Sequence, residues 1–229
     1  MQHGMVRYTP FLEVLSSPDG DDTEWGESAD ICKMSEALQN CKAFETVNEF
    51  NRDFFRTSKE NNKSPFSVFF NNPDGNSTNF DSIAVEIKKF NHKLSAIALC
   101  ETNIDADHKS LYNLEGYDYI YQSKLPNKSK GSGLGLYIDD NLLYEEAPDL
   151  CLCTPDIESL FVKIANGDEP ITLGVVYRSP NGNFNEFITN FENLLEALPK
   201  NNVYITGDFN MNLHNMTENA NAKQYEETF

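Results

Sequence analysis

Short apolar runs separated by turn residues dominate the chain from residue 65 onward. The runs are rich in β-branched and aromatic side chains, as is typical of buried strands. The predicted strands are 66–70, 94–100, 118–121, 135–138, 159–164, 171–177 and 203–207. Two other segments repeat apolar residues at helical spacing, which predicts helices at 80–90 and 184–198, the second ended by Pro199.

The order of these elements predicts an α/β fold. Helices link some neighbouring strands, whereas other strands follow one another directly, and this favours a sandwich of mixed sheets over a doubly wound parallel sheet. We predict one domain with this architecture over residues 65–229. Residues 1–64 are polar and acidic, with a modest helical pattern at about 34–55. They are expected to form a leader or linker that is disordered or partly helical.

Polar side chains follow four of the predicted strands. Asn72 comes after the first strand, Glu101 after the second, Tyr177 at the end of the long strand, and Asp208 with Asn210 after the last. In α/β sheets, ligands collect at the carboxyl ends of strands. We therefore expect these five side chains to gather at one edge of the fold.

These residue types suit metal-assisted phosphate chemistry. Glu101 and Asp208 would suffice to hold Mg²⁺ or Mn²⁺, because such an ion needs only one or two carboxylates in addition to water and phosphate oxygens. Asn72 and Asn210 could donate to phosphate oxygens or align the attacking water. Tyr177 could hydrogen-bond a phosphate as negative charge builds. Taken singly, Glu101 is typical of a helix cap and Asp208 of a turn, and it is the combination that favours a site.

Composition narrows the classes of function. The chain carries 36 acidic and 18 basic residues, a formal net charge of −18. Proteins that bind long stretches of nucleic acid normally have a basic face. We therefore expect this chain to contact phosphates only locally, through a metal ion and a few cationic side chains. DNA binding by this chain alone is expected to be weak. The sequence contains no apolar run of membrane-spanning length and no secretory signal. Five cysteines at no ligand spacing indicate reduced thiols and an intracellular protein, cytoplasmic or nuclear.

Several motifs, taken in order, resemble those of one superfamily. They are Asn72 after the first strand, Ala-Leu-Cys-Glu-Thr at 98–102, Gly-Leu-Gly-Leu-Tyr-Ile at 133–138, Tyr-Arg-Ser-Pro at 177–180 and Gly-Asp-Phe-Asn at 207–210. Together they look like the endonuclease/exonuclease/phosphatase superfamily, and in particular the endonuclease domain of non-LTR retrotransposon polyproteins, which is fused to a reverse transcriptase. The likeness covers about residues 65–214.

The resemblance implies a four-layer α/β sandwich, two mixed sheets flanked by helices, and divalent-metal-dependent cleavage of a phosphodiester. In a retroelement this reaction nicks target DNA before reverse transcription. Carried over to this sequence, Glu101 would bind the metal, while Asp208 and Asn210 would position the attacking water. Asn72 would assist at the metal or the phosphate, and Tyr177 would contact the phosphate.

Basic residues near these motifs are weaker candidates for phosphate binding. Lys124, Lys128 and Lys130 lie in the loop before Gly131, and Arg178 follows the long strand. A solvated loop explains the three lysines equally well. The glycine-rich segment 131–135 is not a nucleotide-binding loop, because a strand rather than a helix follows it.

The sequence departs from the superfamily after Asn210. The resemblance implies a further strand pair with an Asp and a Ser-Asp-His segment, but nothing of that kind follows, and His214 is interpreted as a surface loop residue. Asn72 is followed by Pro73, where relatives usually carry an apolar residue and then Arg-Ser. We expect the last part of the domain to be missing and the chain to be inactive or impaired, since a lost catalytic group typically costs ~10²–10⁴ in rate.

Three functions follow from this pattern. The first is a metal-dependent endonuclease that nicks DNA, derived from a retroelement. The second is a non-catalytic relic or fragment of that domain, which the acidic charge and the missing histidine favour. The third is a phosphoesterase of the same fold that acts on a phosphate outside nucleic acids, because one fold supports many substrates.

Overall fold

Two mixed β-sheets form the centre of the molecule. The computed structural model describes residues 12–14, 47–61, 66–73, 76–105, 111–166 and 170–210, and the predictions for His214 and the rest of 211–229 lie outside them. The described strands are β1 (Leu12–Val14), β2 (Val68–Asn71), β3 (Ala96–Leu99), β4 (Tyr117–Gln122), β5 (Leu134–Asp139), β6 (Tyr144–Glu146), β7 (Leu152–Cys153), β8 (Ile157–Ile164), β9 (Ile171–Arg178) and β10 (Val203–Asp208). The helices are α2 (Val47–Asn61), α3 (Asn76–Ile87) and α4 (Phe184–Ala197), with a short 3₁₀ helix at Pro148–Leu150.

The larger sheet has the strand order β1-β10-β9-β8-β6, and β7 also pairs with β8. β10 runs parallel to β9, whereas β8 and β9 form a long antiparallel pair. Every residue of β9 is buried, and so is every residue of β8 except Lys163. Burial on both faces explains why these two strands appear in the sequence as nearly continuous apolar runs.

The smaller sheet has the order β2-β3-β5-β4. β2 and β3 are parallel and are linked through α3, whereas β3–β5 and β4–β5 are antiparallel. Both sheets are therefore mixed, as the alternation of direct and helical links predicts.

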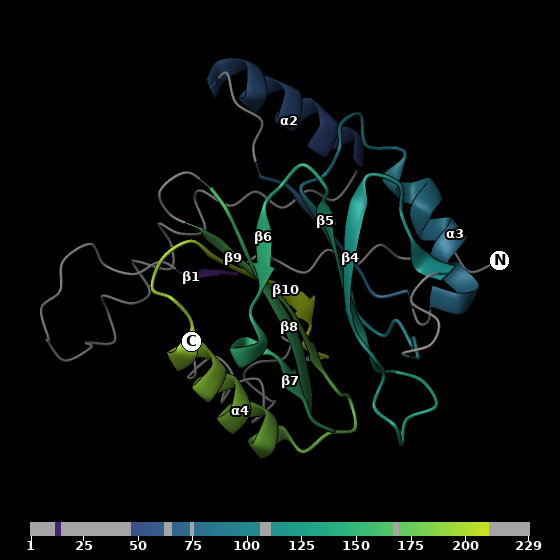
Figure 1. Ribbon diagram of the computed structural model, residues 1–229, viewed down its shortest axis with the longest axis vertical. Helices are drawn as coiled ribbons and strands as arrows, with labels where there is room; N and C mark the ends of the chain where they lie inside the picture. Colours follow the sequence, from purple (N-terminus) through teal and green to yellow (C-terminus); the bar gives the residue numbers. More distant parts are fainter. Residues whose placement is uncertain are drawn as a thin grey trace, which may run out of the picture.

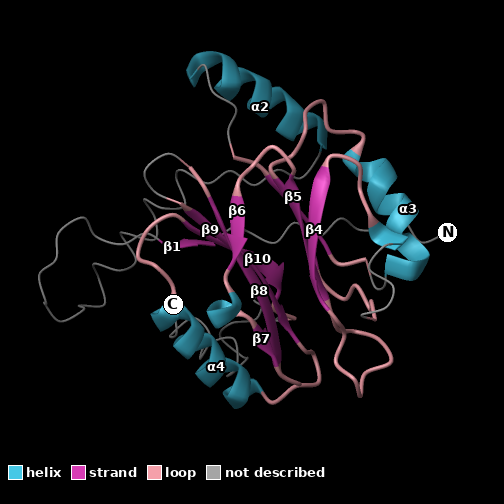
Figure 2. Cartoon of the chain, in the orientation of Figure 1, coloured by secondary structure: helices cyan, strands magenta, loops and turns pink. Residues whose placement is uncertain are grey.

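The sheets pack face to face, and helices cover their outer faces (Figure 1). Inward side chains from both sheets form one core, which includes Leu136 and Val175. α4 packs on the outer face of the larger sheet, while α3 covers the smaller sheet, where Ile83 joins a second cluster. The predicted α/β sandwich of two mixed sheets flanked by helices is confirmed (Figure 2).

α4 shows how the sequence specifies one of these layers. Asn183 caps it, because its side chain accepts hydrogen bonds from the backbone N–H groups of Asn185 and Glu186. Its apolar residues recur at helical spacing, and Phe187 and Phe191 are fully buried against β8, β9 and β10. The helix ends at Ala197, two residues before Pro199, which cannot continue it.

Two elements lie within the segment predicted to be a leader. β1 pairs antiparallel with β10, and α2 contacts the outer side of the smaller sheet through an aromatic cluster. In that cluster the His92 ring stacks on Phe54 at 3.4 Å between ring centroids and on Phe50 at 5.2 Å. The helical pattern at 34–55 is observed as α2 at 47–61, while residues 34–46 lie outside the described part. The domain boundary at residue 65 stays a prediction.

No helix among the described residues is long and apolar enough to cross a bilayer.

Candidate active site

Strand ends from both sheets converge at one place between them. The chain leaves β2 at Asn72 and β3 at Glu101, both in the smaller sheet, and Asp208 ends β10 in the larger sheet. The side-chain amide nitrogen of Asn72 donates to Oε1 of Glu101 at 3.0 Å and to Oδ2 of Asp208 at 2.9 Å. Those two oxygen atoms can therefore be no farther apart than the sum of these distances, and the two carboxylates face one small space.

Tyr177 completes this group from the larger sheet. Its hydroxyl donates to the same Oε1 of Glu101 at 2.9 Å, and its side chain is 1% exposed. Burial raises the pKa of the Tyr177 phenol well above its usual value, and the negative charges of Glu101 and Asp208 raise it further. The phenol therefore stays neutral and remains a hydrogen-bond donor throughout the physiological pH range.

Glu101 sits in a strained stretch of backbone. The backbone φ angle of Glu101 is +50° and that of Asn103 is +54°, values that residues other than glycine rarely adopt. The turn is held on both sides, since Cys100 N–H donates to Asn71 and Thr102 N–H donates to the carbonyl of Gly133. Such strain costs about 1–3 kcal/mol and tends to cluster at functional sites.

Asn210 lies beside the carboxylates with its side chain already engaged. Its backbone N–H donates to Oδ1 of Asp208 at 3.0 Å, and its side-chain nitrogen donates to the carbonyl of Arg178 at 2.8 Å. The left-handed φ of +48° at this residue makes the tight turn possible, and asparagine tolerates that conformation better than most residues. Its predicted role in aligning water stays a prediction.

The side chain of Arg178 contacts the loop that follows β10. Its side chain is buried, and one terminal nitrogen donates to the carbonyls of Phe209 and Asn210 at 3.4 and 3.0 Å. The guanidinium also lies over the rings of Phe184 and Phe187, with 5.4 and 5.8 Å to their centroids. Arg178 therefore fixes the backbone that follows Asp208, and its contact with a phosphate stays a prediction.

The three lysines of the loop after β4 differ in their surroundings. Lys124 forms an ion pair with Asp105 at 3.3 Å, and the ammonium of Lys128 donates to Oγ of Ser179 at 2.8 Å. Lys130 is exposed, and no described residue forms a hydrogen bond or ion pair with it. Of the three, Lys130 is thus the one available to a phosphate. It directly precedes Gly131, where the chain passes close to the site.

The donor set fits a hydrated divalent ion. Within the described ranges no group of three or more His, Cys, Asp and Glu side chains could hold a metal, so a closed cage of protein ligands is not formed there. Mg²⁺ does not need one, because it commonly keeps several waters and binds through one or two carboxylates. Glu101 and Asp208, linked through Asn72, supply that number. They could hold an ion directly from one carboxylate and through a bound water from the other.

The described part of the chain places no histidine beside these carboxylates. The one histidine it contains is His92, whose ring is enclosed in the aromatic cluster under α2. Burial lowers the pKa of His92, so its ring is neutral. His92 belongs to the packing of α2.

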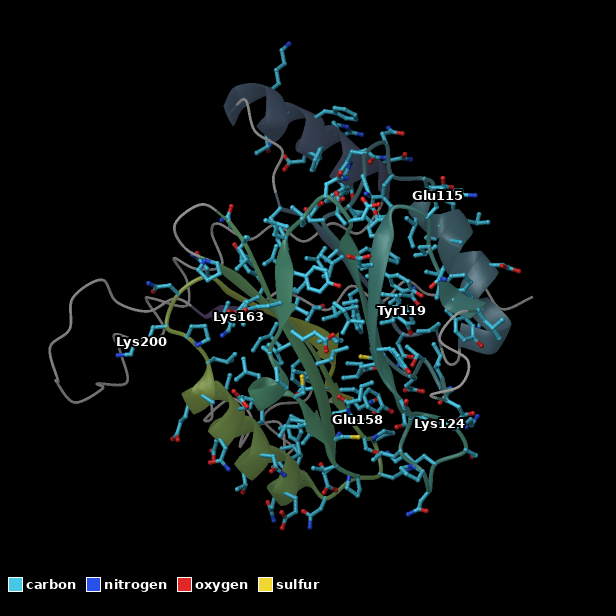
Figure 3. The ribbon with its side chains drawn as sticks, viewed as in Figure 1. Glu115, Tyr119, Lys124, Glu158, Lys163 and Lys200 are labelled. Carbon is cyan, nitrogen blue, oxygen red and sulfur yellow. The ribbon has the colours of Figure 1, made fainter. Side chains whose placement is uncertain are left out.

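One buried acidic residue at the site was missed from the sequence. Glu158, labelled in Figure 3, is the second residue of β8 and is 1% exposed. Its carboxylate accepts hydrogen bonds from Ser132 and Gly133. The predicted strand started at Ser159, two residues after the observed start at Ile157, and so left Glu158 outside it. Extending the apolar run back to Ile157 would have placed Glu158 inside the strand.

Comparison with solved structures identifies the fold. The endonuclease domain of TRAS1, a telomere-specific non-LTR retrotransposon, matches with a TM-score of 0.50 and 17% identity, over 72% of this chain and 69% of that one. The AP endonuclease LMAP from Leishmania major matches with a TM-score of 0.52 and 14% identity, over 71% of this chain and 65% of that one. The chain has the fold of the endonuclease/exonuclease/phosphatase superfamily.

No protein-family model matches the chain, and no curated protein matches it by sequence. The matched regions make up about two thirds of each of the two solved chains. At this level of identity the likeness concerns the fold, so the chemistry of the site has to be argued from its own residues.

Proposed function

We propose that this site hydrolyses phosphodiester bonds with the help of a divalent cation, and that its substrate is DNA, which it nicks as an endonuclease of retroelement origin. The observation that carries the proposal is the bridge made by Asn72. One amide nitrogen joins a carboxylate from each sheet, and Tyr177 donates to the same oxygen of Glu101. This geometry provides a place for a cation, a proton acceptor and a neutral hydrogen-bond donor within one small space.

Each side chain has a distinct part in this reaction. Glu101 would hold Mg²⁺ or Mn²⁺, which supplies charge stabilisation at the phosphate. Asp208 accepts the proton of the attacking water, and its own orientation is fixed by the N–H of Asn210 and by Asn72. Tyr177, neutral because of its burial, donates to a phosphate oxygen as negative charge builds there.

Two observations support DNA as the substrate. Two solved structures that match with a TM-score of 0.50 or more are endonucleases by name, one of them from a non-LTR retrotransposon. Lys130, which pairs with no residue in the described part of the chain, offers a cation directly before Gly131, which lies close to Glu101 and Tyr177. A net charge of −18 implies that binding to DNA is weak.

Nicking of supercoiled plasmid is the direct test. We expect the purified chain with Mg²⁺ or Mn²⁺ at low salt to convert supercoiled plasmid to open circles slowly, as an impaired enzyme would, and the conversion is followed on agarose gels. Removing the cation with EDTA should abolish the conversion, and adding it back should restore it. Loss of nicking in Asp208→Ala would tie the activity to this site rather than to a contaminating nuclease.

A second candidate function is hydrolysis of a phosphodiester outside nucleic acids. The acidic charge favours it, since a small substrate needs no basic face. Parallel assays with a chromogenic phosphodiester such as bis(p-nitrophenyl) phosphate distinguish the two. Metal-dependent turnover of the small ester without nicking would select this second function. Metal binding with no turnover of either substrate would indicate a non-catalytic domain.

A further inference from the structure

The carboxyl group of Glu158 lies directly behind the site, yet the proposed chemistry does not use it. In the antiparallel pairing of β8 and β9, Glu158 stands opposite Tyr177. Directly opposite residues point to the same face of a sheet, so both side chains enter the space between the two sheets. In Figure 3, Glu158 lies at the same end of the molecule as Lys124, which opens the lysine-bearing loop.

Glu158 connects two consecutive loop segments. Its Oε2 accepts hydrogen bonds from the hydroxyl of Ser132 at 3.0 Å and from the backbone N–H of Gly133 at 2.8 Å. The hydroxyl oxygen of Ser132 in turn accepts from the N–H of Leu125 at 2.9 Å. A single buried carboxylate thus holds segment 131–133 directly, and it holds the start of the lysine-bearing loop through Ser132.

The segment that Glu158 holds borders the carboxylates. A Cβ atom placed on Gly131 would lie 3.7 Å from Oε2 of Glu101 and 3.7 Å from the hydroxyl of Tyr177. The carbonyls of Ser132 and Gly133 also accept the N–H groups of Asn103 and Thr102, which follow Glu101. Segment 131–133 therefore touches the strained turn that carries Glu101.

Burying a carboxyl group here carries an energetic cost. Burial raises the pKa of Glu158, the charge of Glu101 adds to this, and the bonds from Gly133 and Ser132 oppose it. Its other oxygen, Oε1, is buried and has no hydrogen-bond partner among the described residues. An apolar side chain of similar size would avoid this cost but would leave the buried N–H of Gly133 without its acceptor. The carboxyl group therefore contributes something that packing alone would not.

We propose that Glu158 is a positioning residue for the site: its carboxyl group fixes segment 131–133 against Glu101 and Tyr177, and through Ser132 it orders the loop that presents Lys130. This inference rests on the proposed function for its catalytic consequence. The clamp itself, from Glu158 to Ser132, Gly133 and Leu125, can be measured without any activity.

Two measurements on the same variants test the proposal. The first is hydrogen–deuterium exchange over residues 123–133, and the second is kcat and KM for plasmid nicking well below the melting temperature. In Glu158→Ala we expect faster exchange at 123–133, a fall in kcat of about 10- to 100-fold from misplacement of Glu101 and Tyr177, and a rise in KM from the loosened lysine loop. Ser132→Ala should show smaller changes in the same direction.

Two further variants separate positioning from loss of stability. Glu158→Gln keeps an oxygen acceptor of the same reach, so it should restore kcat to within about threefold of the wild type. Val162→Ala removes buried volume from the same strand at a distance from the loop, so it should lower the melting temperature but leave kcat, KM and exchange at 123–133 unchanged. If Glu158→Ala cannot be purified in a folded state, Ser132→Ala tests the same hydrogen bond by removing its donor, the Ser132 hydroxyl.

The possible outcomes distinguish a failure of the proposed role of Glu158 from a failure of the proposed function. Unchanged exchange at 123–133 in both Glu158→Ala and Ser132→Ala would overturn the clamp. Faster exchange with kcat and KM within twofold of the wild type would overturn the positioning role and leave only a structural bond. A wild-type chain that turns over no phosphodiester would refute the proposed function and the catalytic part of this inference, while the exchange data would still decide whether the clamp exists.

Discussion

Replacing Asp208 by asparagine is expected to lower the rate of plasmid nicking by about 10²- to 10⁴-fold, the usual contribution of a general base. The substitution preserves the shape of the side chain and keeps one oxygen, which can accept from either Asn210 or Asn72, whereas the carboxylate accepts from both through separate oxygens. It removes the charge and the ability to take up a proton. The measurement is the initial rate of open-circle formation at saturating Mg²⁺.

Asp118→Asn is the matched control for this experiment. Asp118 is exposed on β4, so its substitution changes the net charge by the same amount without touching the site. It should nick at the wild-type rate or slightly faster, because one negative charge fewer eases the approach of DNA. An equal loss of rate in both variants, or none in Asp208→Asn, would contradict the role assigned to Asp208.

Replacing Gly207 by alanine is expected to lower the free energy of unfolding by about 3 kcal/mol or more, which is a large part of the stability of a typical domain. Gly207 pairs with Val176 where β10 runs beside β9, and a Cβ atom there would lie 1.8 Å from the carbonyl oxygen of Val176. Backbone atoms cannot rotate away as a side chain can. The two strands would have to separate at Gly207. This separation would also displace Asp208, which is the next residue in the chain.

Urea denaturation followed by circular dichroism measures this cost, and Gly131→Ala provides the contrast. At Gly131 an added Cβ has space, with neighbours at 3.7 Å, but φ is +72°. Only the left-handed backbone is then penalised, at about 1–2 kcal/mol. A larger loss at Gly131 than at Gly207, or a Gly207→Ala variant as stable as the wild type, would contradict the close approach of β10 and β9.

The layers of the fold could be predicted because buried strands and an amphipathic helix leave plain signals in the sequence. β9 was expected at 171–177 and lies at Ile171–Arg178, and α4 was expected at 184–198 and lies at Phe184–Ala197. β6 and β7 were not predicted, because strands of three and two residues are too short to show a repeating pattern. β1 was not predicted either, since its pairing depends on β10, nearly two hundred residues away in the sequence.

The candidate site was partly predictable for a similar reason. Residues that directly follow buried strands can be located from the strands themselves, and the structure brings Asn72, Glu101, Tyr177 and Asp208 together as expected. The direction of a long side chain is set by its neighbours in space. Arg178 therefore turns toward the backbone of Phe209 and Asn210, which no local pattern could indicate.

Glu158 is a second residue whose surroundings could not be predicted from the sequence. A glutamate beside the turn at 154–156 looks like a surface residue in the sequence, because glutamate is rarely buried without a partner. Its partners, Ser132 and Gly133, lie about 25 residues earlier and are brought close by the packing of the two sheets. Long-range hydrogen bonds of this kind are decided by tertiary structure and leave no periodic signal.

The central claim is that Glu101 and Asp208 share one divalent ion, and locating that ion is its most direct test. Crystals of the chain soaked in Mn²⁺ would show the ion by its anomalous scattering. We predict a peak bonded to Glu101 at about 2.0–2.2 Å and no more than one water molecule away from Asp208. Crystals of Glu101→Gln should lack the peak. A Mn²⁺ ion bound elsewhere, with none at Glu101 under conditions that saturate the crystal, would contradict the account.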